Sequence, residues 1–124
     1  MQVTKILLKE KFREYNKLYF NGELKMPKFT LFKSRIVAGK FAYRVGHGNR
    51  VKDQEIVIGD GFRWTEDLLR DVLVHEMLHY YLVSNGDFRT FPFGHSFRFR
   101  RLMKEYNKKY GLHMTIRIRK SKRL

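Results

Sequence analysis

The 124-residue sequence contains no cysteine, and this absence removes several classes of site at once. Disulfide bridges, thiolate metal sites and cysteine nucleophiles are all excluded. Any metal ion that the chain binds must therefore be held by nitrogen and oxygen donors.

Long hydrophobic runs are absent as well. The N-terminal segment holds an apolar run of only three residues, which is too short for the core of a signal peptide. No other run approaches the length of a membrane-spanning helix. We therefore expect a cytoplasmic protein without membrane contact, with a nucleoid-associated or nuclear location as the alternatives.

Acidic residues are scarce beside basic ones, with 12 Asp and Glu against 27 Lys and Arg, and the net charge is +15. This balance favours polyanionic partners, with DNA or another nucleic acid first among them. Hydrophobic residues make up 43% of the chain and aromatic residues 15%, which is typical of a folded domain. Since no repeat or linker interrupts the chain, we expect one monomeric domain over residues 1–124, with a basic tail from about residue 112.

Hydrophobic spacing predicts the order of the secondary structure. Helices are expected over residues 4–21, 65–85 and 96–110. Each has a capping residue at its start, namely Thr4, Thr65 and Ser96. Strands are expected over residues 29–35, 36–45 and 55–58, and alternation in residues 114–119 indicates a last strand with one basic face. These elements predict an α+β fold with a small, mostly antiparallel sheet packed on helices.

Residues 72–83 of the second predicted helix are apolar almost throughout, and the exceptions are His75, Glu76 and His79. His75 and His79 lie four residues apart, so a helix brings both imidazoles to one face, where they can bind one ion. A helix that is apolar nearly all round is normally buried, and three buried polar side chains are costly unless something satisfies them. A zinc ion would do so, with Glu76 beside it to contact a bound water.

Catalytic zinc takes three protein ligands and keeps one position for water, so a third ligand is needed. His95 is the best candidate, because it lies in line with the apolar face of the third predicted helix. His47, Glu105 and His113 are weaker alternatives, since they lie in a glycine-rich loop, on a charged helix flank and before the basic tail.

If zinc is bound, the expected chemistry is hydrolysis. The metal would lower the pKa of its water to about 7, and Glu76 would accept the proton and pass it to the leaving amine. As water adds to the peptide carbonyl, its oxygen becomes negatively charged and needs a stabilising group. The sequence does not decide between four candidates for this group: Tyr43, Tyr80, Tyr81 and Arg89. Asp71 is either an acceptor that orients His75 or a solvated helix residue, and we favour the solvated residue.

Five short segments, residues 19–24, 39–41, 55–58, 73–79 and 94–99, together resemble the SprT-like zinc metallopeptidase domain. That family includes the Spartan-type proteases, which degrade proteins crosslinked to DNA. The resemblance implies a compact zincin-like domain in which His75, His79 and His95 bind one zinc ion and Glu76 is the general base. The family often has glycine after its third ligand, whereas here Gly94 precedes His95. Many members also carry a cysteine zinc ribbon, for which the basic tail is the candidate substitute here.

Basic residues gather in two places, which together can neutralise several phosphates. The first group lies on one flank of the third predicted helix: Arg98, Arg101, Lys104 and Lys108. The second lies in the tail: Arg117, Arg119, Lys120, Lys122 and Arg123. The loop phenylalanines Phe88, Phe91 and Phe93 can stack unpaired bases or wall a substrate cleft, and we favour the wall.

The expected function is therefore a zinc endopeptidase that acts on proteins associated with nucleic acid. Its partners would be a protein or peptide substrate and DNA or another nucleic acid. A catalytically silent nucleic-acid-binding module with a structural zinc is the alternative.

Overall fold

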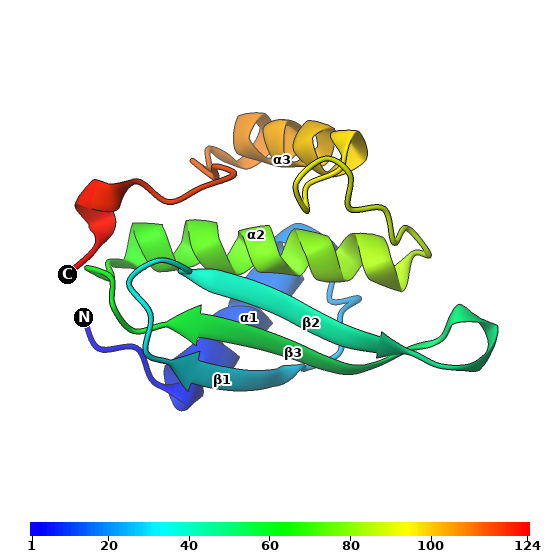
Figure 1. Cartoon of the computed structure of the whole chain (residues 1–124), viewed down its shortest axis with the longest axis horizontal. Coiled ribbons are helices and arrows are strands. Elements are labelled where there is room, and N and C mark those ends of the chain that lie inside the picture. Colours follow the sequence, from blue (N-terminus) through cyan, green and yellow to red (C-terminus); the bar gives the residue numbers. More distant parts are fainter.

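The computed structural model describes residues 1–124, with three helices and three strands (Figure 1). In chain order they are α1 (Lys5–Phe20), β1 (Lys28–Phe32), β2 (Gly39–Val45), β3 (Val51–Gly59), α2 (Glu66–Ser84) and α3 (Phe97–Tyr110). Two short 3-10 turns, His47–Asn49 and Lys120–Lys122, complete the list. The predicted α+β fold is confirmed, and no helix combines the length and the apolar character needed to cross a bilayer.

Capping side chains begin all three helices at the predicted residues. The hydroxyls of Thr4, Thr65 and Ser96 each accept a hydrogen bond from the backbone N–H three residues further on. At the other end, Asn21 and Gly111 adopt the left-handed conformation that ends α1 and α3. Local chemistry thus accounts for where the helices begin and end.

The sheet is mixed, with strand order β1-β3-β2. β2 and β3 form an antiparallel hairpin whose tip projects past the body of the molecule, while β1 pairs with β3 in parallel (Figure 1). We expected a mostly antiparallel sheet, and the difference arises because β3 inserts between β1 and β2, which are neighbours only in sequence. β3 is also longer than predicted, since it begins at Val51.

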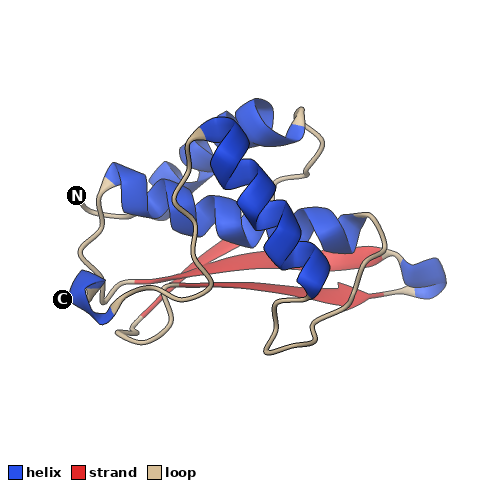
Figure 2. Cartoon of the chain, turned by 90° about the horizontal axis from the view of Figure 1, so that it is seen from above, coloured by secondary structure: helices blue, strands red, loops and turns tan.

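The helices lie along one side of the sheet, and α2 is the central element (Figure 2). α1 and α2 pack on the strands, and α3 packs on α2. Leu73, Val74, Met77 and Leu78 of α2 are completely buried in a core of 23 residues. The predicted burial of this helix is therefore confirmed.

The predicted last strand is wrong, although the alternation that suggested it is present. Along the C-terminal segment, residues 112–119, the even-numbered residues are buried or half-buried and the odd-numbered residues are exposed. No strand pairs with this segment; instead, the Asn107 side chain donates to the carbonyl of Met114 and accepts from its N–H, both at 2.9 Å. Asp71 accepts from the N–H of His113 at 3.3 Å. Side chains of α2 and α3 thus replace a partner strand.

The turn between α1 and β1 depends on one side chain. Asn16 donates to the carbonyl of Leu24 at 2.8 Å and accepts from its N–H at 3.1 Å. We expect Asn16→Ala to lower the free energy of unfolding by about 1–3 kcal/mol, because both backbone groups lose a partner in a partly buried place. Urea denaturation of the metal-free protein measures this loss. Leu18→Ala, at an exposed position of the same helix, should change it by less than about 0.5 kcal/mol, and equal losses would contradict the assignment.

Candidate metal centre and cleft

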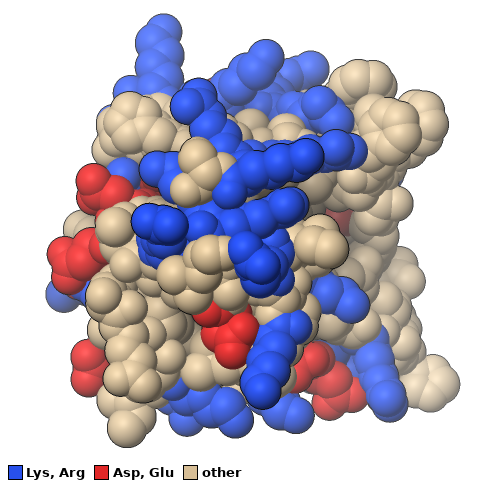
Figure 3. Space-filling view, turned by 60° about the vertical axis from the view of Figure 1, so that its left-hand side comes forward, with Lys and Arg blue, Asp and Glu red and all other residues tan.

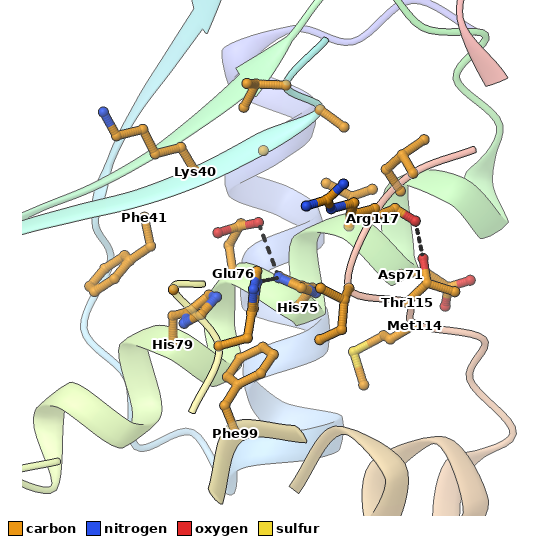
Figure 4. A pocket seen from close by; sticks show the side chains of 18 of the residues that line it. Lys40, Phe41, Asp71, His75, Glu76, His79, Phe99, Met114, Thr115 and Arg117 are labelled. Atoms are coloured by element: carbon orange, nitrogen blue, oxygen red, sulfur yellow. Dashed lines mark hydrogen bonds and ion pairs between the residues drawn. The ribbon is translucent and has the colours of Figure 1, made fainter. Parts of the chain in front are cut away.

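Three histidines from two parts of the chain meet at one point. His75 and His79 lie one turn apart on α2, and His95 comes from the loop before α3. One ring nitrogen of each lies within 4.8 Å of the others, and the Nε2 atoms of His75 and His95 are 3.1 Å apart. Figure 4 shows His75 and His79 on α2 beside Glu76. A tetrahedral zinc ion with bonds of about 2.0–2.1 Å holds its donors about 3.3 Å apart. The cluster therefore has donor atoms that could hold a metal ion.

Backbone contacts orient two of the imidazoles. Nδ1 of His95 lies 3.2 Å from the carbonyl of Phe93, to which it donates its proton, so that Nε2 is left as the free donor atom. The backbone of Thr115, in the C-terminal segment, lies close enough to His75 to raise its pKa against the larger lowering by burial. Such contacts fix the tautomer and direction of a metal-binding imidazole.

Phe99 of α3 packs against all three rings. Its ring stacks on His79 at a centroid distance of 4.0 Å, and it meets His75 at 4.9 Å and His95 at 5.1 Å. The side chain is 1% exposed, so it closes the apolar side of the cluster. Hydrophobic spacing puts Phe99 on the same helix face as His95, but no local pattern predicted that its ring would contact all three imidazoles.

The buried histidines are neutral at pH 7. Burial, followed by the neighbouring imidazoles, lowers the pKa of His75 to about 4 and that of His79 to about 3. Burial is also the main cause of the lowered pKa of His95. Neutral imidazoles keep the lone pair that a metal requires, so all three residues are suited to bind a cation.

Glu76 lies beside the histidines, buried between α2 and β2. Its Oε2 is 3.9 Å from Nε2 of His75, and burial raises its pKa to about 8 in the metal-free chain. A Cβ atom on Gly39 would lie 3.0 Å from this oxygen and 2.9 Å from Cγ1 of Val72. Glycine at this position therefore lets β2 approach the carboxylate, a role that the sequence did not reveal.

The weaker ligand candidates lie outside the cluster. His47 is at the tip of the β2–β3 hairpin, and Glu105 is exposed on α3. His113 is exposed at the edge of the cleft and does not belong to the histidine group. Asp71 binds Arg70 and the backbone of His113, so it is neither a solvated residue nor an acceptor for the His75 ring.

The cluster lies in a cleft of about 1300 Å³. Its walls are the edge strand β2, helix α2, the loop over residues 87–95 and the C-terminal segment. Phe88 lines this cleft as we expected, whereas Phe91 and Phe93 do not, and they are 78% and 88% exposed. The histidines therefore lie in a cleft that is bounded on one side by the edge strand β2.

Two of the four oxyanion candidates lie in the cleft. The hydroxyl of Tyr80 donates to the carbonyl of Lys25 at 3.0 Å, which directs it away from the cleft, and Tyr81 packs on Phe20. Tyr43 and Arg89 line the cleft, but Arg89 forms a 2.8 Å ion pair with Asp87.

A comparison with protein-family models agrees with this geometry. The SprT-like family model matches residues 8–119, which is nearly the whole chain and includes all three histidines. The chain belongs to the SprT-like family. The family is linked to zinc metallopeptidase-like domains, and the resemblance seen in the sequence is confirmed. A search of curated proteins gives no match.

The metal-free protein is expected to be most stable near pH 6.5. Because the pKa values of His75 and His79 fall from 6.5 to about 4 and about 3 on folding, the unfolded chain binds more protons and stability rises up to that pH. The pKa of Glu76 rises from 4.5 to about 8, so the folded chain binds more protons and stability declines between about pH 6.5 and 8. We expect a decline of roughly 1–2 kcal/mol over this range.

Urea denaturation in the presence of a chelator, repeated from pH 5 to pH 9, measures this profile. Glu76→Gln is the matched control, because glutamine does not titrate. The variant should keep the rise at low pH and lose the decline above pH 6.5. A decline of the same size in both proteins would show that Glu76 is not its source.

Proposed function

We propose that this SprT-like domain is a zinc-dependent endopeptidase that cleaves proteins associated with nucleic acid. One observation carries the proposal: three neutral imidazoles converge beside a buried glutamate, in a cleft that opens along the edge strand of a sheet. A purely structural zinc site does not need a carboxylate at that place, whereas hydrolysis needs a base there.

The residues have distinct tasks in peptide hydrolysis. When bound, zinc would supply Lewis acidity and a water of lowered pKa. His75, His79 and His95 would hold it, and its charge would favour the ionised form of the Glu76 carboxyl group. Glu76 then takes a proton from the attacking water and delivers it to the amide nitrogen, so that one water and one peptide bond become a carboxylate and an amine.

A peptide substrate suits the edge of the sheet. β2 is an edge strand, and four of its residues line the cleft: Gly39, Lys40, Phe41 and Tyr43. The outer backbone groups of an edge strand have no partner strand and can pair with an extended segment. Such backbone pairing does not depend on the side chains of the substrate. It would place many different polypeptides beside the histidines, as an enzyme that digests many bound proteins requires.

The basic surface supports contact with nucleic acid. Lys and Arg side chains gather on the upper part of the face in Figure 3, at the height of α3 and the C-terminal segment, and acidic groups lie below and at its edge. Arg101, Lys104 and Lys108 are exposed on α3 without an acidic partner, while Arg98 pairs with Asp87 at 3.6 Å. In the tail, four of the predicted cations are exposed, Arg117, Arg119, Lys120 and Lys122, and Arg123 is partly buried. These groups suit phosphate contacts without base specificity.

We expect Glu76→Gln to lower kcat by about 10²- to 10⁴-fold on a denatured basic protein while one zinc per chain stays bound. His95→Ala should instead lose the metal, because only two protein ligands remain. His113→Ala is the matched control, since this histidine lies at the cleft but outside the cluster. Gel assays of cleavage and metal analysis of the purified proteins measure both effects. Full zinc content without cleavage of any protein by the wild type would favour the silent binding module.

Removal of the three exposed cations of α3 tests the contact with nucleic acid. We expect Arg101→Ala, Lys104→Ala and Lys108→Ala together to weaken DNA binding, and to reduce the slope of log affinity against log salt by up to about 3. DNA-stimulated cleavage should fall in parallel, while cleavage of a short peptide without DNA stays unchanged. The control is a triple variant of three exposed cations on α1, Lys9, Arg13 and Lys17. Equal losses in both triple variants would indicate a response to net charge alone.

A further inference from the structure

Arg117 of the C-terminal segment is exposed to solvent and lines the cleft beside the histidines, with its side chain over the pocket (Figure 4). Its charge is close enough to His95 to contribute to the lowered pKa of that residue. No acidic side chain lies within ion-pair distance of its guanidinium group. The structure thus presents an unpaired guanidinium group to a cleft that would receive substrate.

The backbone that carries Arg117 is held in place at several points. Asn107 binds both backbone groups of Met114, and Asp71 binds the N–H of His113. Thr115 contacts His75 through its backbone, and its hydroxyl donates to the carbonyl of Arg117 at 2.7 Å. The segment is therefore positioned relative to the metal centre itself, and a side chain projecting from it has a defined relation to the reacting atoms.

The other arginines of the cleft are engaged elsewhere or lie further along the chain. Arg89 is paired with Asp87, and Arg123 is partly buried with its backbone bridged to Phe62. Arg119 precedes the 3-10 turn Lys120–Lys122. Among the arginines that line the cleft, Arg117 is the one whose charge acts on the histidine cluster.

We propose that Arg117 is a catalytic residue that binds the carbonyl oxygen of the scissile peptide bond as negative charge develops on it. This inference rests on the proposed peptidase function. As water adds to the carbonyl carbon, the electron pair of the C=O bond moves to that oxygen, and the guanidinium group donates hydrogen bonds to it. The pair then returns, the C–N bond breaks, and the amine leaves with the proton that Glu76 carried. Arg117 neither gains nor loses a proton in this sequence.

A group that acts only on developing charge affects kcat more than substrate binding. Loss of one oxyanion donor typically lowers kcat by about 10²- to 10³-fold. We expect this loss in Arg117→Ala on a short peptide without nucleic acid, with KM changed less than about threefold. Arg117→Lys keeps the charge but not the planar pair of donors, so it should retain intermediate activity.

A binding measurement separates this role from a structural one. The ligand is a peptide phosphonate, whose tetrahedral anionic group resembles the negatively charged intermediate that forms when water adds to the carbonyl. The reference measurement is the affinity for the uncleaved peptide of the same sequence, in the Glu76→Gln background where it is not hydrolysed. Arg117→Ala should weaken phosphonate binding at least tenfold and change peptide affinity, zinc content and the urea midpoint little. Added guanidinium ion at millimolar concentration should restore part of kcat in Arg117→Ala. Arg13→Ala, an exposed arginine of α1, is the charge-matched control and should behave as the wild type.

Wild-type kcat in Arg117→Ala, or equal phosphonate affinity in both proteins, would overturn the inference. A fall in zinc content that accounts for the lost activity would also overturn it, because Arg117 would then act on the metal site and not on substrate. If the wild type cleaves no peptide, the proposed function fails. The phosphonate comparison would still decide, in that case, whether Arg117 binds an anion in the cleft.

Discussion

Burial of His75, Glu76 and His79 within the otherwise apolar stretch 72–83 of α2 is the constraint on which the rest of the structure depends. Desolvation lowers the pKa of both histidines and raises that of Glu76, so in the metal-free chain all three groups tend toward neutrality. The helix can therefore be buried between the sheet and α3 without an isolated charge. A cation in the cluster reverses this for Glu76, because a positive charge nearby favours the carboxylate. Folding and the proposed hydrolysis would thus use different protonation states of one residue.

The metal centre requires that several parts of the chain meet around α2. Docking of α3 brings Phe99 against the three imidazoles, and the loop before α3 brings His95. β2 closes the Glu76 side, where Gly39 leaves room for the carboxylate. The C-terminal segment reaches His75 from the remaining direction. Since each part also contributes to packing, disturbance of the core is expected to shift the donor atoms before the chain unfolds.

The sequence predicted the features that depend on local chemistry. Capping residues marked the helix ends, and the four-residue spacing of His75 and His79 placed both imidazoles on one face of α2. Features that depend on distant partners were missed. The last strand was predicted because residues 114–119 alternate, but alternation reports burial and not pairing, and here Asn107 takes the hydrogen bonds of a partner strand. In the same way, Gly39 is explained only by its approach to Glu76, which lies 37 positions along the chain.

The positively charged side chains of this protein act over two different distances. Cations spread over α3 and the tail act through water at long range, so their attraction for a polyanion weakens as salt is added. Arg117, which lines the cleft, would act on charge at short range, where screening by salt is weaker than over a Debye length. If the proposed function holds, a rise in ionic strength would release nucleic acid while hydrolysis in the cleft continues. Binding to nucleic acid would raise the local concentration of bound proteins without any change in the metal centre.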